Sequence, residues 1–132
     1  MRPPKILVVD DDPDVRRVFA TVLRTSYEVE EAAGGRAALE KLSAQTYQLL
    51  LLDLHMPDID GYAVLHALGH RDARNHDIPV IVVTADGTDE ARTRARRSRS
   101  VYFLSKPVPI RVLADLVRST LERAAASRKS RP

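Results

Sequence analysis

The sequence predicts an α/β domain built on a five-stranded parallel sheet with helices on both faces. Segments typical of strands and of helices alternate five times along the 132 residues, without an internal repeat. Two of the strand-like segments, 49–52 and 80–83, contain only leucine, isoleucine and valine. A strand without polar alternation is typical of a parallel sheet that is covered by helices on both sides.

The first half of the chain supplies two strands and two helices. Residues 5–9 form a strand, and Asp12 followed by Pro13 is a typical helix start. Residues 27–32 alternate apolar and acidic side chains, as expected of a half-exposed edge strand, and a helix follows over 36–44. The apolar face predicted for the first helix consists of Val15, Val18, Phe19, Val22 and Leu23.

The middle of the chain places its most apolar segment between two helices. We predict a strand over 48–53, a helix over 62–68 and a strand over 79–84. The polar connection at 69–77 is longer than most loops between such elements.

The helix predicted at 88–98 is unusual because it has little apolar surface. Ala91 and Ala95 are its only apolar residues, and arginines surround them. A helix of this kind buries little area, so we expect it to be loosely docked or frayed. A strand at 101–104 follows, and a last amphipathic helix carries Ile110, Leu113, Leu116, Val117 and Leu121.

Composition restricts the class of protein. Apolar residues make up 44% of the chain and charged residues 30%, which fits one globular domain, expected over 1–124, with a basic, disordered tail over 125–132. No apolar run is long enough to cross a bilayer, and the chain contains no cysteine for a disulfide or a thiolate site. We therefore expect a cytoplasmic protein without a membrane partner.

The net charge of +3 conceals a strong asymmetry. Residues 91–132 contain twelve Lys/Arg and two Asp/Glu, a balance of +10, whereas residues 1–90 contain nine and sixteen, a balance of −7. An acidic part of the chain therefore precedes a basic part.

Polar residues that could react or bind a ligand stand at or just after the ends of four of the predicted strands. Asp10 and Asp11 come after the first strand, Asp53 after the third, Thr84 ends the fourth and Lys106 follows the fifth. The carboxyl ends of parallel strands lie at the same edge of a sheet, where ligands bind in open α/β folds. We expect these five residues to converge there. Three crowded carboxylates favour a divalent cation, and oxygen ligands suit Mg²⁺.

These residues resemble the receiver domain of bacterial-type two-component response regulators, over residues 4–124. The resemblance implies a flavodoxin-like, doubly wound sheet with strand order 2-1-3-4-5. It also implies a signalling domain that assists its own phosphorylation and dephosphorylation, rather than an enzyme acting on a separate substrate. The matching motifs are Val8-Val9-Asp10-Asp11-Asp12, Asp53-Leu54-His55-Met56-Pro57 with Asp60-Gly61, Val83-Thr84-Ala85, and Lys106-Pro107.

The resemblance implies that Asp53 accepts a phosphoryl group from a histidine kinase or a phosphotransfer protein, with Mg²⁺ as the cofactor. Asp11 and Asp53 would each give the metal a carboxylate oxygen, and His55 would give its backbone carbonyl. Asp10 would act mainly through a metal-bound water. The modified state would alter the face formed by the helix at 88–98, the strand at 101–104 and the last helix, where an unknown output partner binds.

Further roles follow from the same resemblance. Lys106 would pair with the acids and then with the phosphoryl oxygens, and its peptide bond to Pro107 would be cis. The Thr84 hydroxyl and the Ala85 N–H would donate hydrogen bonds to the phosphoryl group. Thr84 would also couple to Phe103, whose ring fills the space that Thr84 vacates; the alternative is that Phe103 is only a core residue.

Several positions depart from the family pattern. Phe103 replaces the more usual tyrosine and has no hydroxyl, and Arg99-Ser100 replaces a Gly-Ala pair. A glycine would ease a left-handed turn, so Arg99 predicts strain or a rearranged loop. His55 and Asp86 occupy positions that tune dephosphorylation in the family.

Two other functions were weighed. A module that keeps the fold but signals without phosphorylation would account for the unusual helix at 88–98, although the complete set of site residues disfavours it. Direct binding of nucleic acid by the basic C-terminal half is a minority alternative, because the arginine cluster lacks interleaved aromatic residues.

Overall fold

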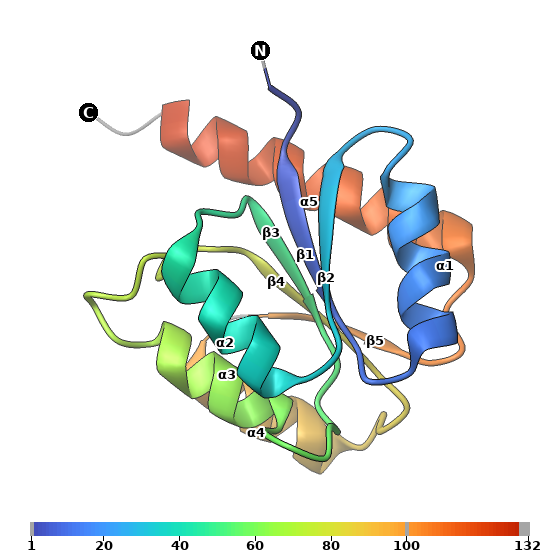
Figure 1. Ribbon diagram of the computed structural model, residues 1–132, viewed down its shortest axis with the longest axis vertical. Helices are drawn as coiled ribbons and strands as arrows, with labels where there is room; N and C mark the ends of the chain where they lie inside the picture. The colour runs from blue at the N-terminus through green and yellow to red at the C-terminus, as the bar shows by residue number, and fades with distance from the viewer. Residues whose placement is uncertain (1, 100, 130–132) are drawn as a thin grey trace.

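The sheet has five parallel strands in the order β2-β1-β3-β4-β5, as the sequence and its resemblance predicted (Figure 1). The computed structural model describes residues 2–99 and 101–129. The first, third and fourth strands are interior because each pairs with two neighbours. The strands are β1 (Lys5–Val9), β2 (Glu28–Ala32), β3 (Leu49–Leu52), β4 (Val80–Thr84) and β5 (Tyr102–Ser105).

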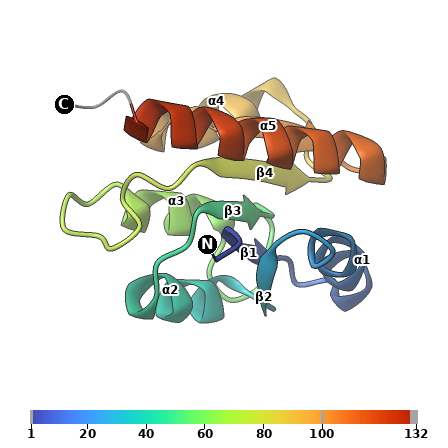
Figure 2. The ribbon, with the colours of Figure 1, turned by 90° about the horizontal axis from the view of Figure 1, so that it is seen from above.

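The helices form two layers, one on each face of the sheet (Figure 2). One layer consists of α1 (Pro13–Leu23) and α5 (Ile110–Lys129). The other layer consists of α2 (Gly35–Ala44), α3 (Gly61–Leu68) and α4 (Asp89–Ser98). Among the described residues, no helix is both long enough and apolar enough to cross a membrane.

The position of β3 between the two helix layers explains why four consecutive leucines are tolerated there. Leu49 and Leu51 belong to the core under α1 and α5, whereas Leu50 and Leu52 belong to the core under α2, α3 and α4. All four side chains are at most 1% exposed. Alternate side chains of a strand point to opposite faces, so a central strand between two helix layers needs apolar residues at every position.

Two expectations about the helices in the α1/α5 layer are wrong. Val18 was assigned to the buried face of α1 but is 49% exposed, because the helix packs through Phe19, Ala20 and Leu23 instead. Helix α5 continues to Lys129, so residues 125–129 are helical rather than a disordered tail. Residues 130–132 lie outside the described residues.

Helix α4 makes two small buried contacts. The Thr88 hydroxyl caps its start by accepting the Ala91 N–H at 3.1 Å, and Ala91 and Ala95 are both nearly fully buried. Arg94 adds a contact with α3, because its guanidinium lies 3.9 Å from the centre of the Tyr62 ring. A guanidinium over an aromatic face supplies contact area that the helix lacks in aliphatic side chains.

The segment after α4 is not strained by the missing glycine. Arg99 has an extended backbone, with φ near −173°, and no described residue has positive φ. Its guanidinium donates a 2.6 Å hydrogen bond to the Ile78 carbonyl, which ties the end of α4 to the start of β4. The backbone strain that the missing glycine predicted is therefore not present at Arg99. Ser100 lies outside the described residues.

A cluster of polar side chains joins the β2 edge of the sheet to α2. Glu30 accepts from Lys5 at 2.7 Å, from Lys41 at 3.2 Å and from the Tyr47 hydroxyl at 2.8 Å. Partial burial disfavours the carboxylate, but these three donors outweigh it and lower the pKa of Glu30 to about 2.

The variant Glu30→Gln tests the contribution of this cluster to stability. We expect its free energy of unfolding at pH 7 to fall by about 1–2 kcal/mol, because three donors lose an ionised acceptor. Since the pKa is depressed below its ordinary 4.5, the wild-type advantage is complete above about pH 4.5 and disappears as the pH falls toward about 2. Urea titrations across this pH range measure the difference in the free energy of unfolding between the wild type and the variant. Glu28→Gln, at an exposed ion pair with Arg2, is the matched control, and equal pH profiles for the two variants would contradict the prediction.

Candidate functional site

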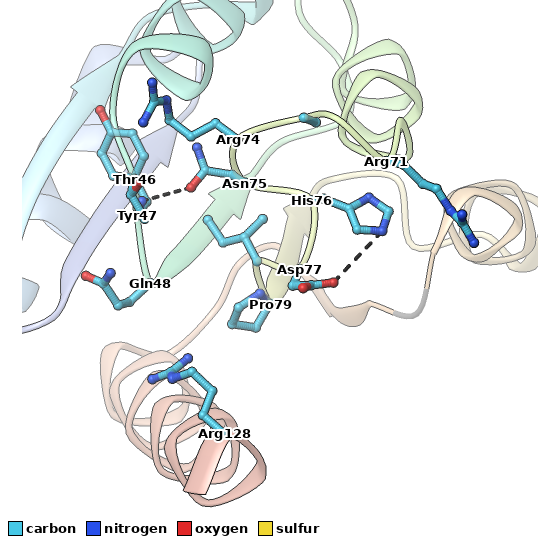
Figure 3. A pocket seen from close by; sticks show the side chains of 12 residues that line it. Thr46, Tyr47, Gln48, Arg71, Arg74, Asn75, His76, Asp77, Pro79 and Arg128 are labelled. Atoms are coloured by element: carbon cyan, nitrogen blue, oxygen red, sulfur yellow. Dashed lines mark hydrogen bonds and ion pairs between the residues drawn. The ribbon is translucent and has the colours of Figure 1, made fainter. Parts of the chain in front are cut away.

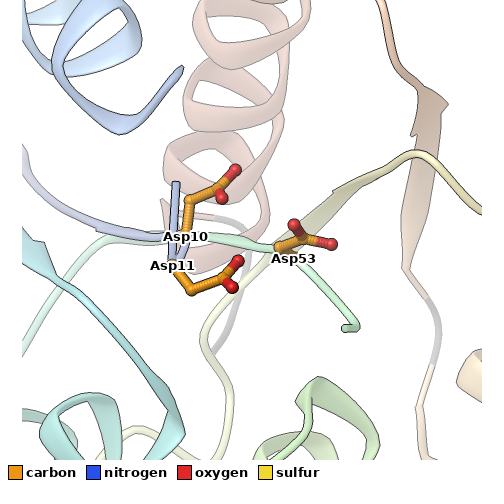
Figure 4. Close-up of side chains that lie close together, drawn as sticks. All are labelled: Asp10, Asp11 and Asp53. Carbon is orange, nitrogen blue, oxygen red and sulfur yellow. The ribbon is translucent and has the colours of Figure 1, made fainter. Parts of the chain in front are cut away.

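Three aspartates meet at the carboxyl edge of the sheet, as predicted (Figure 4). Asp10 and Asp11 follow β1, and Asp53 follows β3. Carboxylate oxygens of the three residues all lie within 4.8 Å of one another. Asp10 and Asp53 are buried, whereas Asp11 is exposed, so the cluster opens to solvent on one side.

Main-chain hydrogen bonds beyond the strand ends hold two of these residues in place. The Asp53 N–H donates to the Val9 carbonyl at 3.0 Å, and the Asp10 N–H donates to the Ala32 carbonyl at 3.2 Å. The parallel ladder of β2, β1 and β3 therefore continues through the two aspartates. Their relative position is set by the register of the sheet rather than by a flexible loop.

Lys106 reaches the same edge from β5. Its ammonium lies 2.7 Å from Asp10 Oδ2 and 2.9 Å from Asp53 Oδ2. The Lys106 N–H donates to the Thr84 carbonyl at 2.8 Å, which extends the pairing of β4 with β5. The Lys106-Pro107 peptide bond is cis, so that expectation is confirmed.

Burial and charge act in opposite directions at this ion pair. Burial raises the pKa of the Asp10 carboxyl above its ordinary value despite the hydrogen bond from Lys106. Burial also disfavours the charged form of Lys106, but the hydrogen bonds to Asp10 and Asp53 raise its pKa. An ammonium between two carboxylates is thus the arrangement that keeps the buried charges compensated.

The donor set at this edge fits Mg²⁺. Three carboxylates face one ammonium, so two negative charges are left without a compensating side chain. Mg²⁺ prefers oxygen ligands, takes one or two carboxylates and keeps several waters. Beside the cluster lies an open hollow of about 420 Å³, lined by Asp11, His55, Met56, Pro57 and Asp60.

Thr84 ends the neighbouring strand β4, and Ala85 follows it. Thr84 is fully buried, and its hydroxyl oxygen accepts the Asp86 N–H at 3.3 Å. Ala85 is exposed at the end of the strand. Both residues thus lie at the edge that carries Asp53, because β4 pairs with β3 in register.

A side-chain bridge joins the two loops that leave β3 and β4. His55 Nε2 lies 3.1 Å from Asp86 Oδ2, and the His55 N–H donates to Asp53 Oδ1 at 3.3 Å. Hydrogen bonds from Thr88 and from His55 lower the pKa of Asp86. The sequence marked both positions but gave no sign that they contact each other.

Gly61 contributes to the site through its missing side chain, which the sequence analysis did not anticipate. A Cβ atom at this position would lie 2.4 Å from the Asp53 carbonyl oxygen and 2.7 Å from the Leu54 Cα. Both are backbone atoms, so a side chain would displace the segment that carries Asp53. The Asp60-Gly61 motif therefore allows α3 to start directly against the segment that carries Asp53.

Phe103 lies on the α4 side of the sheet. Its ring is partly buried against the α2/α3/α4 core, and the Arg92 guanidinium lies 5.0 Å from the ring centre. The adjacent Tyr102 points to the other face, where its hydroxyl accepts from Arg123 of α5 at 2.7 Å. The arginine contact was missed because nothing in the spacing of Arg92 and Phe103 indicates it.

The opposite edge of the sheet has a hollow of about 470 Å³, at the amino ends of β3 and β4 (Figure 3). Buried Asn75 organises it by accepting the Tyr47 N–H at 2.9 Å and donating to the Leu42 and Gln45 carbonyls. These bonds fasten the long connection after α3 to the end of α2. We interpret this region as a structural junction, because its buried polar atoms satisfy one another.

This fold, with three carboxylates and a lysine at the carboxyl edge of the sheet, is that of a signalling receiver domain. The model of the response regulator receiver domain matches residues 6–118, and the chain belongs to this family. It is 33% identical, over 94% of its length, to the regulatory protein VanRB of Enterococcus faecalis, and 34% identical, over 92%, to the transcriptional regulatory protein ResD of Bacillus subtilis. It spans only 54% and 49% of these two relatives, about half of their length.

Solved structures agree with this assignment. The Francisella response regulator 1452 receiver domain superposes with a TM-score of 0.82 at 28% identity, covering 91% of this chain and 98% of that one. A CheY-like receiver domain protein from Methanospirillum hungatei gives a TM-score of 0.84 at 25% identity, covering 95% and 98%.

The variant Lys106→Met tests the charge balance of the site. Without Mg²⁺, we expect its free energy of unfolding to fall by about 3 kcal/mol, because Asp10 and Asp53 lose their buried counter-ion. Urea unfolding with and without Mg²⁺ measures this loss. Added Mg²⁺ should reduce the difference in the free energy of unfolding between the variant and the wild type. Lys41→Met, which breaks a more exposed pair with Glu30, should cost less than about 1 kcal/mol. A Lys106 variant as stable as this control would contradict the prediction.

Proposed function

We propose that Asp53 accepts a phosphoryl group from a histidine kinase or a phosphotransfer protein. The observation that carries this proposal is the position of Lys106, whose ammonium lies within 3 Å of both Asp10 and Asp53 at an edge shared with Asp11. A carboxylate that must receive an anionic group needs compensating positive charge on the same side. Membership of the receiver family supports the same conclusion.

The transfer is a displacement at phosphorus. An Asp53 carboxylate oxygen forms the new bond to phosphorus, while the bond from phosphorus to the donor imidazole nitrogen breaks and its electron pair returns to the ring. Lys106 exchanges part of its contact with Asp53 for the incoming phosphoryl oxygens. The Thr84 hydroxyl and the Ala85 N–H donate to the remaining oxygens, since both lie at the end of β4.

Mg²⁺ is the proposed cofactor, and it supplies positive charge that offsets the charge on the phosphoryl oxygens during transfer. Asp11 and Asp53 would hold it through carboxylate oxygens and His55 through its backbone carbonyl, with Asp10 acting through a water. The same residues would allow the domain to assist its own dephosphorylation. In this respect it acts as a self-modifying signalling domain rather than as an enzyme with a separate substrate.

The signal would leave the site through Thr84 and Phe103. Movement of the buried Thr84 toward the phosphoryl group would free space on the α4 side of the sheet, which the Phe103 ring can fill. The face of α4, β5 and α5 would then change and bind its output partner. A cytoplasmic location is part of this proposal.

Asp53→Asn is the direct test of the phosphoacceptor. After treatment with acetyl phosphate and Mg²⁺, we expect a shifted band for the wild type in Phos-tag electrophoresis and none for the variant, because an amide is not a nucleophile of this kind. Asp72→Asn, at an exposed residue of the loop after α3, should shift like the wild type. An unshifted wild type would favour a module that signals without phosphorylation.

Thr84→Ala separates acceptance of the group from its readout. We expect the variant to be phosphorylated, since the nucleophile, the metal ligands and Lys106 are intact, but to transmit less of the change to Phe103. The measurement is the amide chemical-shift change of α4 and β5 on addition of acetyl phosphate, which should be reduced in the variant. Thr46→Ala, at an exposed position on the opposite edge, is the control. Full-size shifts in Thr84→Ala would exclude Thr84 as the coupling residue.

A further inference from the structure

Helix α4 carries a concentration of positive charge that the described part of the chain does not neutralise. Between 89 and 99 there are five arginines and two acids, Asp89 and Glu90, a balance of +3. None of the arginines at 92, 94, 96 and 97 forms an ion pair with a residue that the structure describes. Arg96 and Arg97 are exposed.

The exposed side of α4 has opposite charges at its two ends. A shallow hollow of about 380 Å³ runs along it, lined by Asp89, Glu90, Thr93, Arg94 and Arg97. The acids lie at the first turn and the arginines toward the last, as the helix dipole favours. A ligand that fits this hollow places acidic groups against Arg94 and Arg97 and hydrogen-bond donors against the two acids.

We propose that this side of α4, defined by Thr93, Arg94, Arg96 and Arg97 and called here the arginine face, is a docking surface for an acidic segment of a partner protein. The proposal rests on the proposed function in one respect, which is that α4 belongs to the output surface. It adds the chemistry of the partner, which the family assignment does not specify. Electrostatic complementarity of this kind sets partner choice and the rate of association.

Two other occupants fit less well. A second copy of the chain could pair the acids of one helix with the arginines of the other, but segment 89–99 of each copy has a net charge of +3, so an excess of positive charge would remain at such an interface. A nucleic acid presents phosphates along its whole length, so it would also meet Asp89 and Glu90 at the start of the hollow. An acidic protein segment can place acids and donors in the order that the helix requires.

Arg92 connects the arginine face with the proposed switch. Its guanidinium stacks on Phe103, while its Nε is buried and has no hydrogen-bond partner among the described residues. The Phe103 ring is thus a contact that links this side chain to β5. When the ring turns inward, Arg92 loses that contact, and the charge that α4 presents to a partner changes with it.

The test uses an oligoglutamate peptide with a fluorescent label as the acidic probe, and fluorescence anisotropy with the full chain. We expect the double variant Arg96→Gln/Arg97→Gln to bind the peptide about fivefold more weakly than the wild type, because two exposed charges are lost. The matched control is Arg71→Gln/Arg128→Gln, which removes the same charge from exposed positions at the opposite edge and should bind like the wild type. Circular dichroism verifies that each variant is folded.

Three results would contradict the proposal that the arginine face is a docking surface. The first is equal weakening of peptide binding by both double variants. The second is tighter binding of a short DNA duplex than of the peptide, through Arg96 and Arg97. The third is a dimer of the wild type, seen in sedimentation equilibrium, that the double variant Arg96→Gln/Arg97→Gln does not form. All three are measured on unphosphorylated protein, so they do not depend on Asp53.

The link through Arg92 has its own readout. Acetyl phosphate should change the peptide affinity of the wild type and leave that of Arg92→Met unchanged, with phosphorylation of both followed by Phos-tag electrophoresis. A phosphorylated wild type with unaltered affinity overturns the link. A wild type that is not phosphorylated at all instead overturns the proposed function, and the link with it.

Discussion

The ion pair of Lys106 with Asp10 and Asp53 is the interaction on which the rest of this structure depends. Buried carboxylates are costly, and two of them side by side are tolerated because an ammonium lies within 3 Å of each. The three residues come from strands that are far apart in the sequence, so only the completed sheet brings them together. Folding and the assembly of the site are therefore the same event, and a chain with a slipped register would have no site.

The sheet also explains why so much could be predicted from residues alone. Fully apolar strands such as Leu49–Leu52 occur where helices cover both faces, and parallel strands must end at a common edge. These two constraints are enough to place Asp10, Asp53 and Lys106 together from the sequence. The receiver motifs added the strand order and the cis peptide, and both are confirmed.

Other features could not be predicted because they depend on contacts between side chains distant in sequence. Val18 has helical spacing with buried residues, yet it lies at the margin of the face that packs. Arg99 was expected to bring either strain or a rearranged loop, and the structure gives it an extended backbone without strain and a hydrogen bond to the Ile78 carbonyl. Counting apolar residues missed part of the contacts of helix α4, because aromatic rings provide partners for Arg92 and Arg94.

The two arginine–aromatic stacks of α4 have a consequence for how the domain responds to its surroundings. Attraction between exposed charges weakens as ionic strength rises, because mobile ions screen it within a Debye length. A guanidinium that lies over a ring owes part of its stability to excluded water and to close contact, which dissolved ions affect much less. Helix α4 can thus keep its contact with α3 at an ionic strength that would release the proposed acidic partner from its outer surface. Packing of α4 within the molecule and binding between molecules thus depend on different physical forces on one short helix.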